Sequence, residues 1–397
     1  MDTITQRAQS ILNERGDLLF LMCLILYTGI MASLSLLKLQ TFFTTHDIGI
    51  FTQSYWTTLY DGRFFYNDLE FSEAGVLSHF GIHVSPVLLL LIPLYAVSPG
   101  PEILLIVQSI LYGSGAIPLF LAAKRMLGNP SALVVSLVYF LYPALHGANL
   151  FDFFEISFLP LLLGFFLYGI CFRRMLLILS CGIACLMIKE DVSVLILCAS
   201  GVGLIRHYRE PGNLKWAYTF LILLSILWII VSFTLIIPGY GSPSGETTGY
   251  SFVHQYSSSL PAIQENLYPR GEYLFQLFYP LLFIPALVPE MLIIALPPFA
   301  EILLSFSYFD IRYHFSPLVI PILFFATILG LEKIRHRLAD DSKGRYRALL
   351  IILVVNAVVA CLWFSPVMDA VSLVHSDRLH HADSEWFREG TALIPAD

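Results

Sequence analysis

Charged residues are scarce in this sequence of 397 residues. Asp, Glu, Lys and Arg make up 13% of it, whereas 57% of the residues are hydrophobic and the mean hydropathy is +0.75. A soluble globular protein contains about 25% charged residues, so the composition excludes a soluble fold of this length. It indicates a chain with many membrane spans and the lipid bilayer as its first partner. The formal net charge of −7 also gives no reason to expect a nucleic acid partner.

Cysteine is sparse as well, with six residues in the chain. All six lie inside apolar runs, which excludes a disulfide framework and argues against a thiolate metal site. A usable N-glycosylation acceptor is missing, because the triplet that begins at Asn129 has proline in its second position. The first apolar stretch, 18–37, is long for a signal peptide and has no clear cleavage site, so we expect an uncleaved first span.

Long apolar runs supply the positive signal. A helix crosses a membrane with about 17–25 apolar residues. One run, 84–97, is short for a crossing, and we expect it to form an interfacial or re-entrant helix. The predicted fold class is an all-α, polytopic bundle of transmembrane helices with about eleven crossings. The expected crossings are 17–37, 101–123, 131–149, 156–172, 175–188, 192–205, 216–237, 273–288, 290–305, 315–331 and 348–366.

Basic residues fix the expected orientation through the positive-inside rule. Four basic segments all lie on the cytoplasmic side of the membrane only if the run 84–97 does not cross it. The N-terminus is then expected in the cytoplasm and the C-terminus outside the cell membrane. The transmembrane domain is then 1–366, with outer loops at 38–83 and 238–272. The tail, 367–397, is expected outside, with a short amphipathic helix at 383–387. The four segments are 124–125, 173–174, 206–215 and 333–347.

Ionisable residues recur near membrane depth, where they are costly and usually functional. On the expected topology they fall at the outer ends of the spans, so we expect the functional site at the outer face. They form five groups along the chain: Asp47; His79 with His83; Asp152 with Glu155; Lys189 with Glu190 and Asp191; and Arg312 with His314.

The fourth group carries the strongest physical argument. Lys189, Glu190 and Asp191 lie between two apolar runs of about 14 residues, each about 21 Å long as a helix. Such helices cannot cross a core about 30 Å thick unless the turn between them lies below the surface. Charged, irregular backbone at that depth must face protein or a water-filled cavity. We therefore expect a polar cavity, open to the outer face, with both acids and bases on its wall.

Each group also has a plainer interpretation. The fourth group can be a structural cluster whose charges neutralise one another. Asp152 and Glu155 can be solvated residues at a helix N-terminus, where the helix dipole favours acids. Arg312 can reach lipid headgroups with its long side chain. His79 and His83 can bind a metal ion or serve as caps.

The order and spacing of these motifs resemble a family of prokaryotic predicted membrane proteins of unknown function, related in layout to the GT-C glycosyltransferases. The resemblance spans nearly the whole chain, with one departure at Phe154, where the family pattern has His. The motifs that carry it are Asp47-Ile48-Gly49-Ile50-Phe51 with Gln53 and Trp56, His83-Val84-Ser85-Pro86, Asp152-Phe153-Phe154-Glu155, Lys189-Glu190-Asp191 and Arg312-Tyr313-His314-Phe315-Ser316-Pro317.

The resemblance implies an enzyme that moves a sugar from a polyprenyl-phosphate carrier to an acceptor on the outer face. The matching acid, Asp47, would act as general base or as metal ligand, and a divalent metal ion is left open. Arg312 would stabilise the leaving phosphate, with Lys189 and His314 as further choices. The resemblance also implies that an outer soluble domain follows a segment like 392–397, so we expect this chain either to be a truncated form or to lack that domain. The remaining expected substrate-binding residues are Gln53, Trp56, His83, Asp152, Glu155, Glu190 and Asp191.

Two other classes of function stay open on the sequence alone. Short, interrupted helices with buried charges also suit a transporter or flippase of a lipid-linked or anionic substrate. A non-catalytic protein that keeps the GT-C-like scaffold would show the same motifs. The sequence identifies neither the sugar nor the acceptor.

Overall fold

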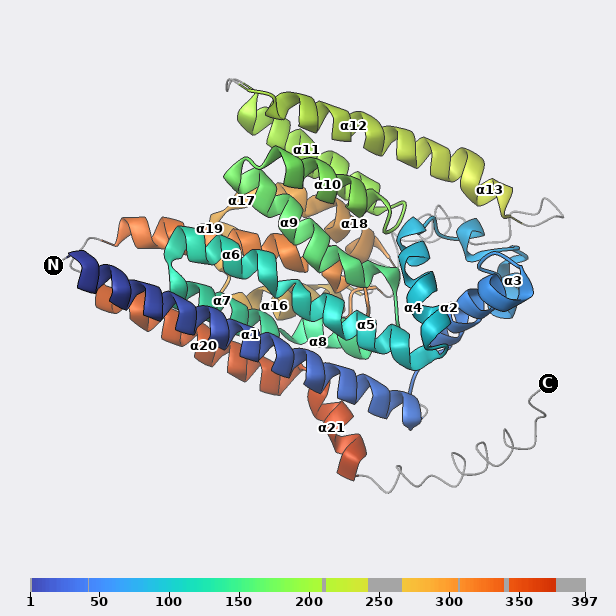
Figure 1. The fold of residues 1–397 in the computed structure, drawn as a ribbon, viewed down its shortest axis with the longest axis horizontal. Helices are drawn as coiled ribbons and strands as arrows, with labels where there is room; N and C mark the ends of the chain where they lie inside the picture. Colours follow the sequence, from blue (N-terminus) through green and yellow to red (C-terminus); the bar gives the residue numbers. More distant parts are fainter. Residues whose placement is uncertain are drawn as a thin grey trace.

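The computed structural model describes residues 2–41, 43–208, 212–241, 266–305, 308–338 and 343–375, and no strand occurs in these ranges. Long helices run side by side along the long axis of the molecule, and short helices cover the end opposite the N-terminus (Figure 1). The predicted all-α helical bundle is therefore confirmed. The expected helix at 383–387 and most of the loop 238–272 lie outside the described residues.

Five helices are long and apolar enough to cross a membrane, or up to seven if two bent pairs each count as one span. The expected count of about eleven crossings is therefore not confirmed. The short run 84–97 belongs to one bent pair, in which Asp68–Gly81 and Pro86–Val97 meet at 79°. The second pair, Asn129–Phe140 and Pro143–Leu150, bends by 46°. The five spans are Arg15–Gln40, Pro101–Leu127, Glu155–Phe172, Leu214–Gly239 and Gly344–Phe364.

Proline and short helices explain why the other apolar runs do not form full spans. The run 273–288 stops being α-helical after Phe278, because the chain passes through left-handed conformations at Leu282 and Phe283. The run 290–305 divides at Ala295 ahead of a proline. The runs expected at 175–188 and 192–205 become helices of 12 and 16 residues, too short for an upright crossing.

The helices before residue 173 form the first half of the bundle and its cap. α1 (Asp2–Gln40) leads into the short cap helices, and α5 to α9 return to the bundle (Figure 1). The cap contains α2 (Asp47–Trp56), a π-helical turn (Thr57–Asp61), α3 (Asp68–Ala74), η2 (His79–Gly81), η3 (Pro86–Leu91) and α4 (Ile92–Val97). The bundle then continues with α5 (Pro101–Ser114), α6 (Ala116–Leu127), α7 (Asn129–Phe140), α8 (Pro143–Leu150), η4 (Glu155–Phe158) and α9 (Leu159–Phe172).

The remaining helices complete the bundle. The first group is α10 (Met175–Leu186), α11 (Val192–His207), α12 (Leu214–Val231), a π-helical turn (Ser232–Ile236) and α13 (Ile237–Gly239). The second is α16 (Leu267–Phe278), η6 (Tyr279–Leu281), η7 (Ile284–Leu287), α17 (Pro289–Ile294) and α18 (Leu296–Leu304). The last is η8 (Ser316–Leu318), α19 (Ile320–Arg337), α20 (Lys343–Phe364) and α21 (Val367–His375).

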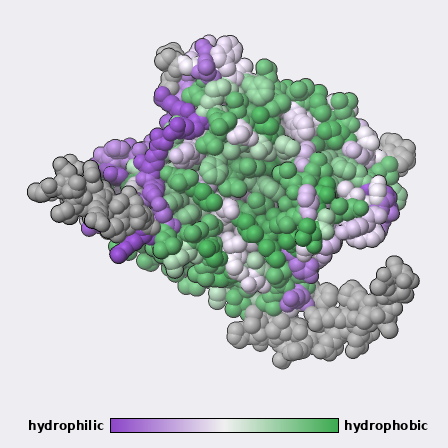
Figure 2. Space-filling model, in the orientation of Figure 1, coloured by the Kyte–Doolittle hydropathy of each residue, from purple (hydrophilic) through white to green (hydrophobic). Residues whose placement is uncertain are grey.

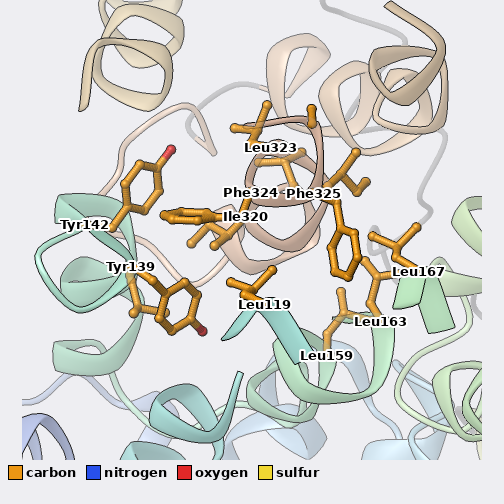
Figure 3. Close-up of a cluster of buried hydrophobic side chains, with 14 of the residues drawn as sticks. Leu119, Tyr139, Tyr142, Leu159, Leu163, Leu167, Ile320, Leu323, Phe324 and Phe325 are labelled. Carbon is orange, nitrogen blue, oxygen red and sulfur yellow. The ribbon is translucent and has the colours of Figure 1, made fainter. Parts of the chain in front are cut away.

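α19 lies at the centre of the core. Phe324 is fully buried and meets Tyr139 and Tyr142 edge-on, with ring centroids 5.2 and 5.1 Å away (Figure 3). Edge-to-face aromatic contacts add to the free energy gained by burying the rings. Both tyrosine hydroxyls donate to backbone carbonyls, so the polar atoms are satisfied inside the apolar core.

The surface of the middle of the bundle is apolar. Hydrophobic residues cover the centre of the visible face, and hydrophilic residues gather towards its two ends (Figure 2). α12 and α20 expose large aliphatic side chains, among them Leu223 at 62% and Leu362 at 64%. An apolar band of this size is expected of a surface in contact with lipid.

Basic residues from distant segments meet at the end of the bundle that contains the N-terminus. This end therefore brings together two of the basic segments that we expect in the cytoplasm, 124–125 and 333–347, and it lies opposite the cap (Figure 1). The contacts that join them are an ion pair of Lys124 with Asp17, the guanidinium of Arg125 over Phe172 at 4.4 Å, a hydrogen bond from Arg335 to the carbonyl of Leu127 at 3.1 Å, and an ion pair of Lys333 with Glu290 at 3.2 Å.

Candidate functional site

Asp47 and Asp152 share one hydroxyl group. Thr45 Oγ1 lies 2.8 Å from Asp47 Oδ2 and 2.7 Å from Asp152 Oδ2, although Asp47 and Asp152 belong to different parts of the chain. Because a hydroxyl has one proton to donate, it cannot hydrogen-bond both carboxylates at once when both are ionised. The two carboxyl groups therefore form a coupled pair at the start of α2.

The two acids differ in their surroundings. Asp152 is 1% exposed and also accepts hydrogen bonds from the backbone N–H groups of Thr45 and Ile48. Asp47 has a side chain that is 20% exposed, and His46 Nε2 lies 3.7 Å from its Oδ1, beyond hydrogen-bond distance. Burial raises the pKa of Asp47 above its ordinary value, against the hydrogen bond from Thr45, which lowers it. Asp47 is thus the accessible member of the pair, with a pKa raised above its ordinary value.

Gln108 holds the backbone turn that carries Asp152. Its amide nitrogen donates to the carbonyls of Asn149, Phe151 and Asp152, and its amide oxygen accepts from the N–H of Phe154. Gln108 is fully buried in α5, so this amide replaces the hydrogen bonds that the chain loses where α8 ends. The position of Asp152 therefore depends on a polar residue inside a span.

Lys38 supplies a positive charge beside this pair. It lies in the last turn of α1, and its ammonium donates to the carbonyl of Leu150. The same ammonium is close enough to Asp152 for the carboxylate charge to act on it. Lys38 is a cation of this site that no sequence motif indicates.

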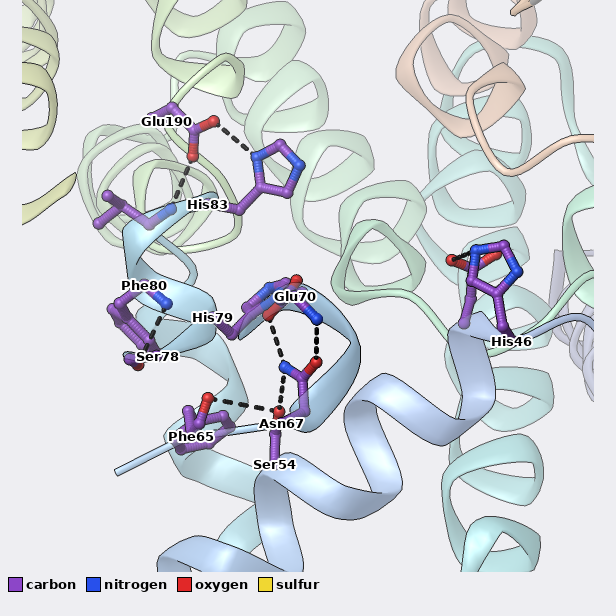
Figure 4. A network of polar contacts seen from close by, with 12 residues as sticks. His46, Ser54, Phe65, Asn67, Glu70, Ser78, His79, Phe80, His83 and Glu190 are labelled. Atoms are coloured by element: carbon purple, nitrogen blue, oxygen red, sulfur yellow. Dashed lines mark hydrogen bonds and ion pairs between the residues drawn. The ribbon is translucent and has the colours of Figure 1, made fainter. Parts of the chain in front are cut away.

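The cap folds around a buried dyad of Glu70 and His79. Glu70 Oε1 lies 2.8 Å from His79 Nδ1, and Asn67 Nδ2 donates to Glu70 Oε2 at 2.5 Å (Figure 4). Asn67 also caps α3, because its Oδ1 accepts from the N–H of Glu70 at 2.8 Å. Ser54 of α2 accepts from Asn67 Nδ2, so the dyad is tied to the helix that starts with Asp47.

A second dyad joins the loop to the bundle. His83 Nδ1 lies 2.9 Å from Glu190 Oε1, and the N–H of Val84 donates to Glu190 Oε2 at 2.7 Å (Figure 4). Burial would raise the pKa of Glu190, but His83, Lys189 and the Val84 N–H together lower it to about 2. Glu190 therefore stays ionised and holds η3 against the turn between α10 and α11.

The other two charges of that turn pair with each other. Lys189 Nζ lies 3.0 Å from Asp191 Oδ2, and both side chains are nearly buried. Burial alone would lower the pKa of Lys189, but the charges of Asp191 and Glu190 outweigh it and raise that pKa. Glu301 of α18 lies beside Asp191 and adds a third carboxyl group to the cluster. Lys189 and Asp191 thus neutralise each other, as the structural interpretation of this group expects. Glu190 pairs with His83 instead.

Glu155 is a buried acid, 2% exposed, that is close enough to His79 and Lys189 for its charge to act on both. Glu155 Oε2 has no hydrogen-bond partner among the described residues, and the same holds for His79 Nε2. A buried polar atom without a protein partner marks a place where water or a polar ligand group belongs.

Aromatic rings separate the Asp47 pair from the dyads. Phe51 of α2 contacts His79 on one side, with ring centroids 5.2 Å apart, and Phe153 and Phe154 on the other. His314 stacks on Phe154 with centroids 3.5 Å apart. Burial, with smaller contributions from Lys189 and His83, holds the pKa of His314 well below its ordinary value, so His314 is neutral at neutral pH.

Arg312, Gln53 and Trp56 lie away from these dyads. The guanidinium of Arg312 is 67% exposed and grips Asp310, with NH2 2.7 Å from Oδ2. Gln53 binds Asp68 through both its amide oxygen and its amide nitrogen. Trp56 is half exposed and contacts Tyr60. The structure therefore brings His83, Glu190, Lys189, Asp191, Glu155 and His314 together, joins Asp152 to Asp47, and leaves Arg312, Gln53 and Trp56 at the surface.

Five residues that contact the Asp47–Asp152 pair or the Glu70–His79 dyad, or position Asp152, were not predicted from the sequence. One sequence signal was available, because Asn67 followed three residues later by Glu70 has the spacing of a helix N-terminus with reciprocal capping. The others take their roles from contacts between distant segments, which a sequence pattern does not reveal. The missed residues are Lys38, Thr45, Asn67, Glu70 and Gln108.

The part of the chain that the structure describes contains no group of three or more His, Cys, Asp or Glu side chains that could hold a metal ion. The Nδ1 atoms of His79 and His83 face carboxylates, which is the arrangement that also supports metal-binding histidines. Among the described residues no third ligand accompanies these two histidines.

The apolar surface, the span-length helices and the ionisable network at one end define the class: an all-α membrane protein. The chain belongs to the family described as "Predicted membrane protein (DUF2079)", whose model matches residues 38–395. This confirms the resemblance to a predicted membrane protein family of unknown function. The comparisons with curated proteins and with solved structures give no match, so the likeness to GT-C enzymes belongs to the proposal below.

Proposed function

We propose that this protein transfers a sugar from a polyprenyl-phosphate donor to an acceptor hydroxyl, with Asp47 as general base. The observation that carries the proposal is the pairing of Asp47 with Asp152 through Thr45 Oγ1. It gives one carboxylate that is fixed and buried, and one that is reachable and has a raised pKa. A carboxylate with a raised pKa accepts a proton more readily at neutral pH.

The chemistry balances as one displacement. The acceptor hydroxyl gives its proton to Asp47 Oδ1, and the acceptor oxygen attacks the anomeric carbon of the sugar. The bond from that carbon to the phosphate oxygen breaks, and its electron pair leaves with the lipid phosphate. Attack from the face opposite the phosphate inverts the anomeric carbon. The departing phosphate carries the developing charge and needs a cation.

Arg312 remains the proposed cation for the phosphate. Its planar guanidinium can grip a phosphate with two hydrogen bonds, and Asp310 already orients it. Its segment lies against the turn that carries Asp152, because Phe151 contacts both Tyr313 and His314. The phosphate would replace Asp310 at an exposed guanidinium, which suits a charged group at the membrane surface.

The proposed setting is the cell membrane, with the N-terminus in the cytoplasm and the cap outside. The gathering of Lys124, Arg125, Lys333 and Arg335 at one end supports this orientation. The cap, which holds Asp47 and both dyads, is then on the outer side. The tail 367–397 would be extracytoplasmic.

The test is transfer of radiolabelled sugar from polyprenyl-phosphate donors by the purified protein in lipid vesicles. Asp47→Asn should reduce transfer by about 100-fold or more, the size of effect expected for loss of a general base. Asp61→Asn is the matched control, because Asp61 is an acid of the same loop that pairs with Arg63 at the surface. Equal activity of wild type and Asp47→Asn would remove Asp47 from the mechanism, and absence of transfer with every donor would favour a non-catalytic scaffold.

A transporter or flippase is the second candidate. The observation that favours it is the break between α10 and α11, where Lys189 and Asp191 are paired and nearly buried. Vesicles that accumulate or flip a lipid-linked substrate without releasing sugar would support this candidate over transfer. Charge loss in Lys189→Met should then abolish movement of the substrate.

A further inference from the structure

His79 and His83 lie one turn apart on the same short segment. The N–H of His83 donates to the carbonyl of His79 at 2.9 Å, and this turn brings the two rings within 5.9 Å of each other, centroid to centroid. The planes cross at 63°. At this separation the ring nitrogens are too far apart for a direct hydrogen bond, so a proton passes between the two imidazoles through a bridging water molecule.

Each ring is backed by a carboxylate from a different part of the fold. Glu70 of α3 binds His79 Nδ1, and Glu190 of the α10–α11 turn binds His83 Nδ1. A carboxylate accepts, so Nδ1 carries a proton in both rings and Nε2 is the nitrogen that gains and loses protons. The two dyads therefore present the same nitrogen for exchange.

The two rings differ in their access to solvent. The side chain of His83 is 27% exposed, whereas that of His79 is 4% exposed. His79 Nε2 is buried and without a hydrogen-bond partner among the described residues, and the same is true of Glu155 Oε2. The charges that act on His79 come from Glu70, Glu155 and Glu190. The series thus runs from a partly exposed ring through a buried ring to a buried carboxyl group.

We propose that His83 and His79 form a proton relay between the outer surface and the buried carboxyl group of Glu155. Because His79 Nε2 and Glu155 Oε2 have no direct partner among the described residues, each step runs through a bridging water molecule. A protonated His83 gives its Nε2 proton to one water, which gives a proton to His79 Nε2. A second water carries a proton from His79 Nε2 to Glu155 Oε2 in the same way. Only N–H and O–H bonds form and break. Chains of His, Asp and Glu serve as proton routes in many membrane proteins. The relay goes beyond the proposed transfer reaction and does not depend on it.

Glu70 and Glu190 are positioning residues in this relay. They hold the tautomer of each ring and stabilise the imidazolium that forms when a proton passes. Glu155 is the terminal acceptor, and its charge also acts on Lys189. The relay therefore couples the protonation of the buried cluster to the pH outside.

The experiment is NMR spectroscopy of protein with ¹⁵N-labelled histidine in lipid nanodiscs, which reports the tautomer and the proton exchange rate of each ring. His83→Gln should slow solvent exchange of the His79 ring proton at least tenfold, because the exposed end of the relay is lost. His46→Gln is the matched control, because the side chain of His46 is 70% exposed and outside both dyads. A change of less than twofold in His83→Gln would overturn the relay.

A second variant tests the positioning residue. Glu70→Gln should convert His79 from a single tautomer to a mixture, and Glu70→Asp should restore part of the single-tautomer signal. An unchanged tautomer in Glu70→Gln would overturn the role of the dyad. The buried ring of His146, which bonds Ser365 Oγ and the carbonyl of Phe140, reports whether each variant is folded. Neither measurement depends on sugar transfer, so failure of the relay and failure of the proposed function are distinguishable.

Discussion

The imidazole of His314 lies flat on the ring of Phe154, with centroids 3.5 Å apart and planes 10° apart. Burial, to which the Phe154 ring contributes, keeps the pKa of His314 well below its ordinary value, with smaller contributions from Lys189 and His83.

Phe154→Ala should therefore raise the pKa of His314 towards its ordinary value of about 6.5, because water would reach the ring. The measurement is a pH titration of the His314 signal in ¹⁵N-histidine spectra. Phe71→Ala is the control, since Phe71 is 44% exposed and contacts Tyr66 at the surface. A His314 signal that still does not titrate above pH 5 in Phe154→Ala would contradict the role given to the stack.

Gln108→Leu should destabilise the protein by about 2–4 kcal/mol, because several buried backbone groups lose their partner at once. The measurement is the unfolding temperature in detergent and, where unfolding is reversible, the free energy of unfolding. Gln276→Leu is a matched control, since Gln276 is at the surface and bonds Glu272. Equal stability of the two variants would show that the turn at Asp152 does not depend on the Gln108 amide.

The stability contributed by Glu190 should depend on pH. Its pKa is lowered to about 2 in the folded protein, so its contribution is present above the unfolded value of about 4.3 and is lost as the pH falls towards 2. Glu190→Gln should therefore be less stable than wild type at pH 6, and the difference should shrink between pH 5 and pH 3. The measurement is the unfolding temperature of both proteins across this range. A constant difference would contradict an ionised Glu190.

Thr45→Val should change how the rate of the proposed transfer reaction falls at acidic pH. The hydrogen bond from Thr45 lowers the pKa of Asp47, so without the hydroxyl the pKa rises and more of the base is protonated at a given acidic pH. Transfer at pH 6 should fall more than transfer at pH 8. Thr45→Ser keeps the hydroxyl and should behave as wild type. A pH profile of Thr45→Val that matches wild type would separate the hydroxyl from the function of Asp47.

The sequence predicted the fold class and the sequence positions of the charged groups for physical reasons. Apolar runs and scarce charge leave few alternatives to a helical membrane protein, and the charges in such runs stand out because they are costly there. The count of crossings was harder to predict, because prolines and left-handed residues such as Leu282 and Phe283 interrupt runs whose composition alone fits a span.

The partners of the charged groups could not be predicted from the sequence. Glu190 stands between Lys189 and Asp191, yet it pairs with His83, 107 positions away. Arg312 has the residue type expected at a phosphate site, but its nearest carboxylate is two positions away at Asp310. The sequence pattern indicates which charged residues are energetically costly at membrane depth. The packing of distant segments decides which of these residues contact one another. Substrate binding by these residues stays a prediction.

The pairing of Thr45 with Asp152 has a consequence for how the protein is made. The two residues are 107 positions apart, and a ribosome adds about 5–20 residues per second. The loop after the first span therefore waits about 5–20 s before its partner has been synthesised. During that interval Thr45 and Ile48 lack the carboxylate of Asp152 that they bind, so the start of α2 is outside its final packing. Correct assembly of the cap is thus a late step in the biogenesis of a chain whose first span is inserted early.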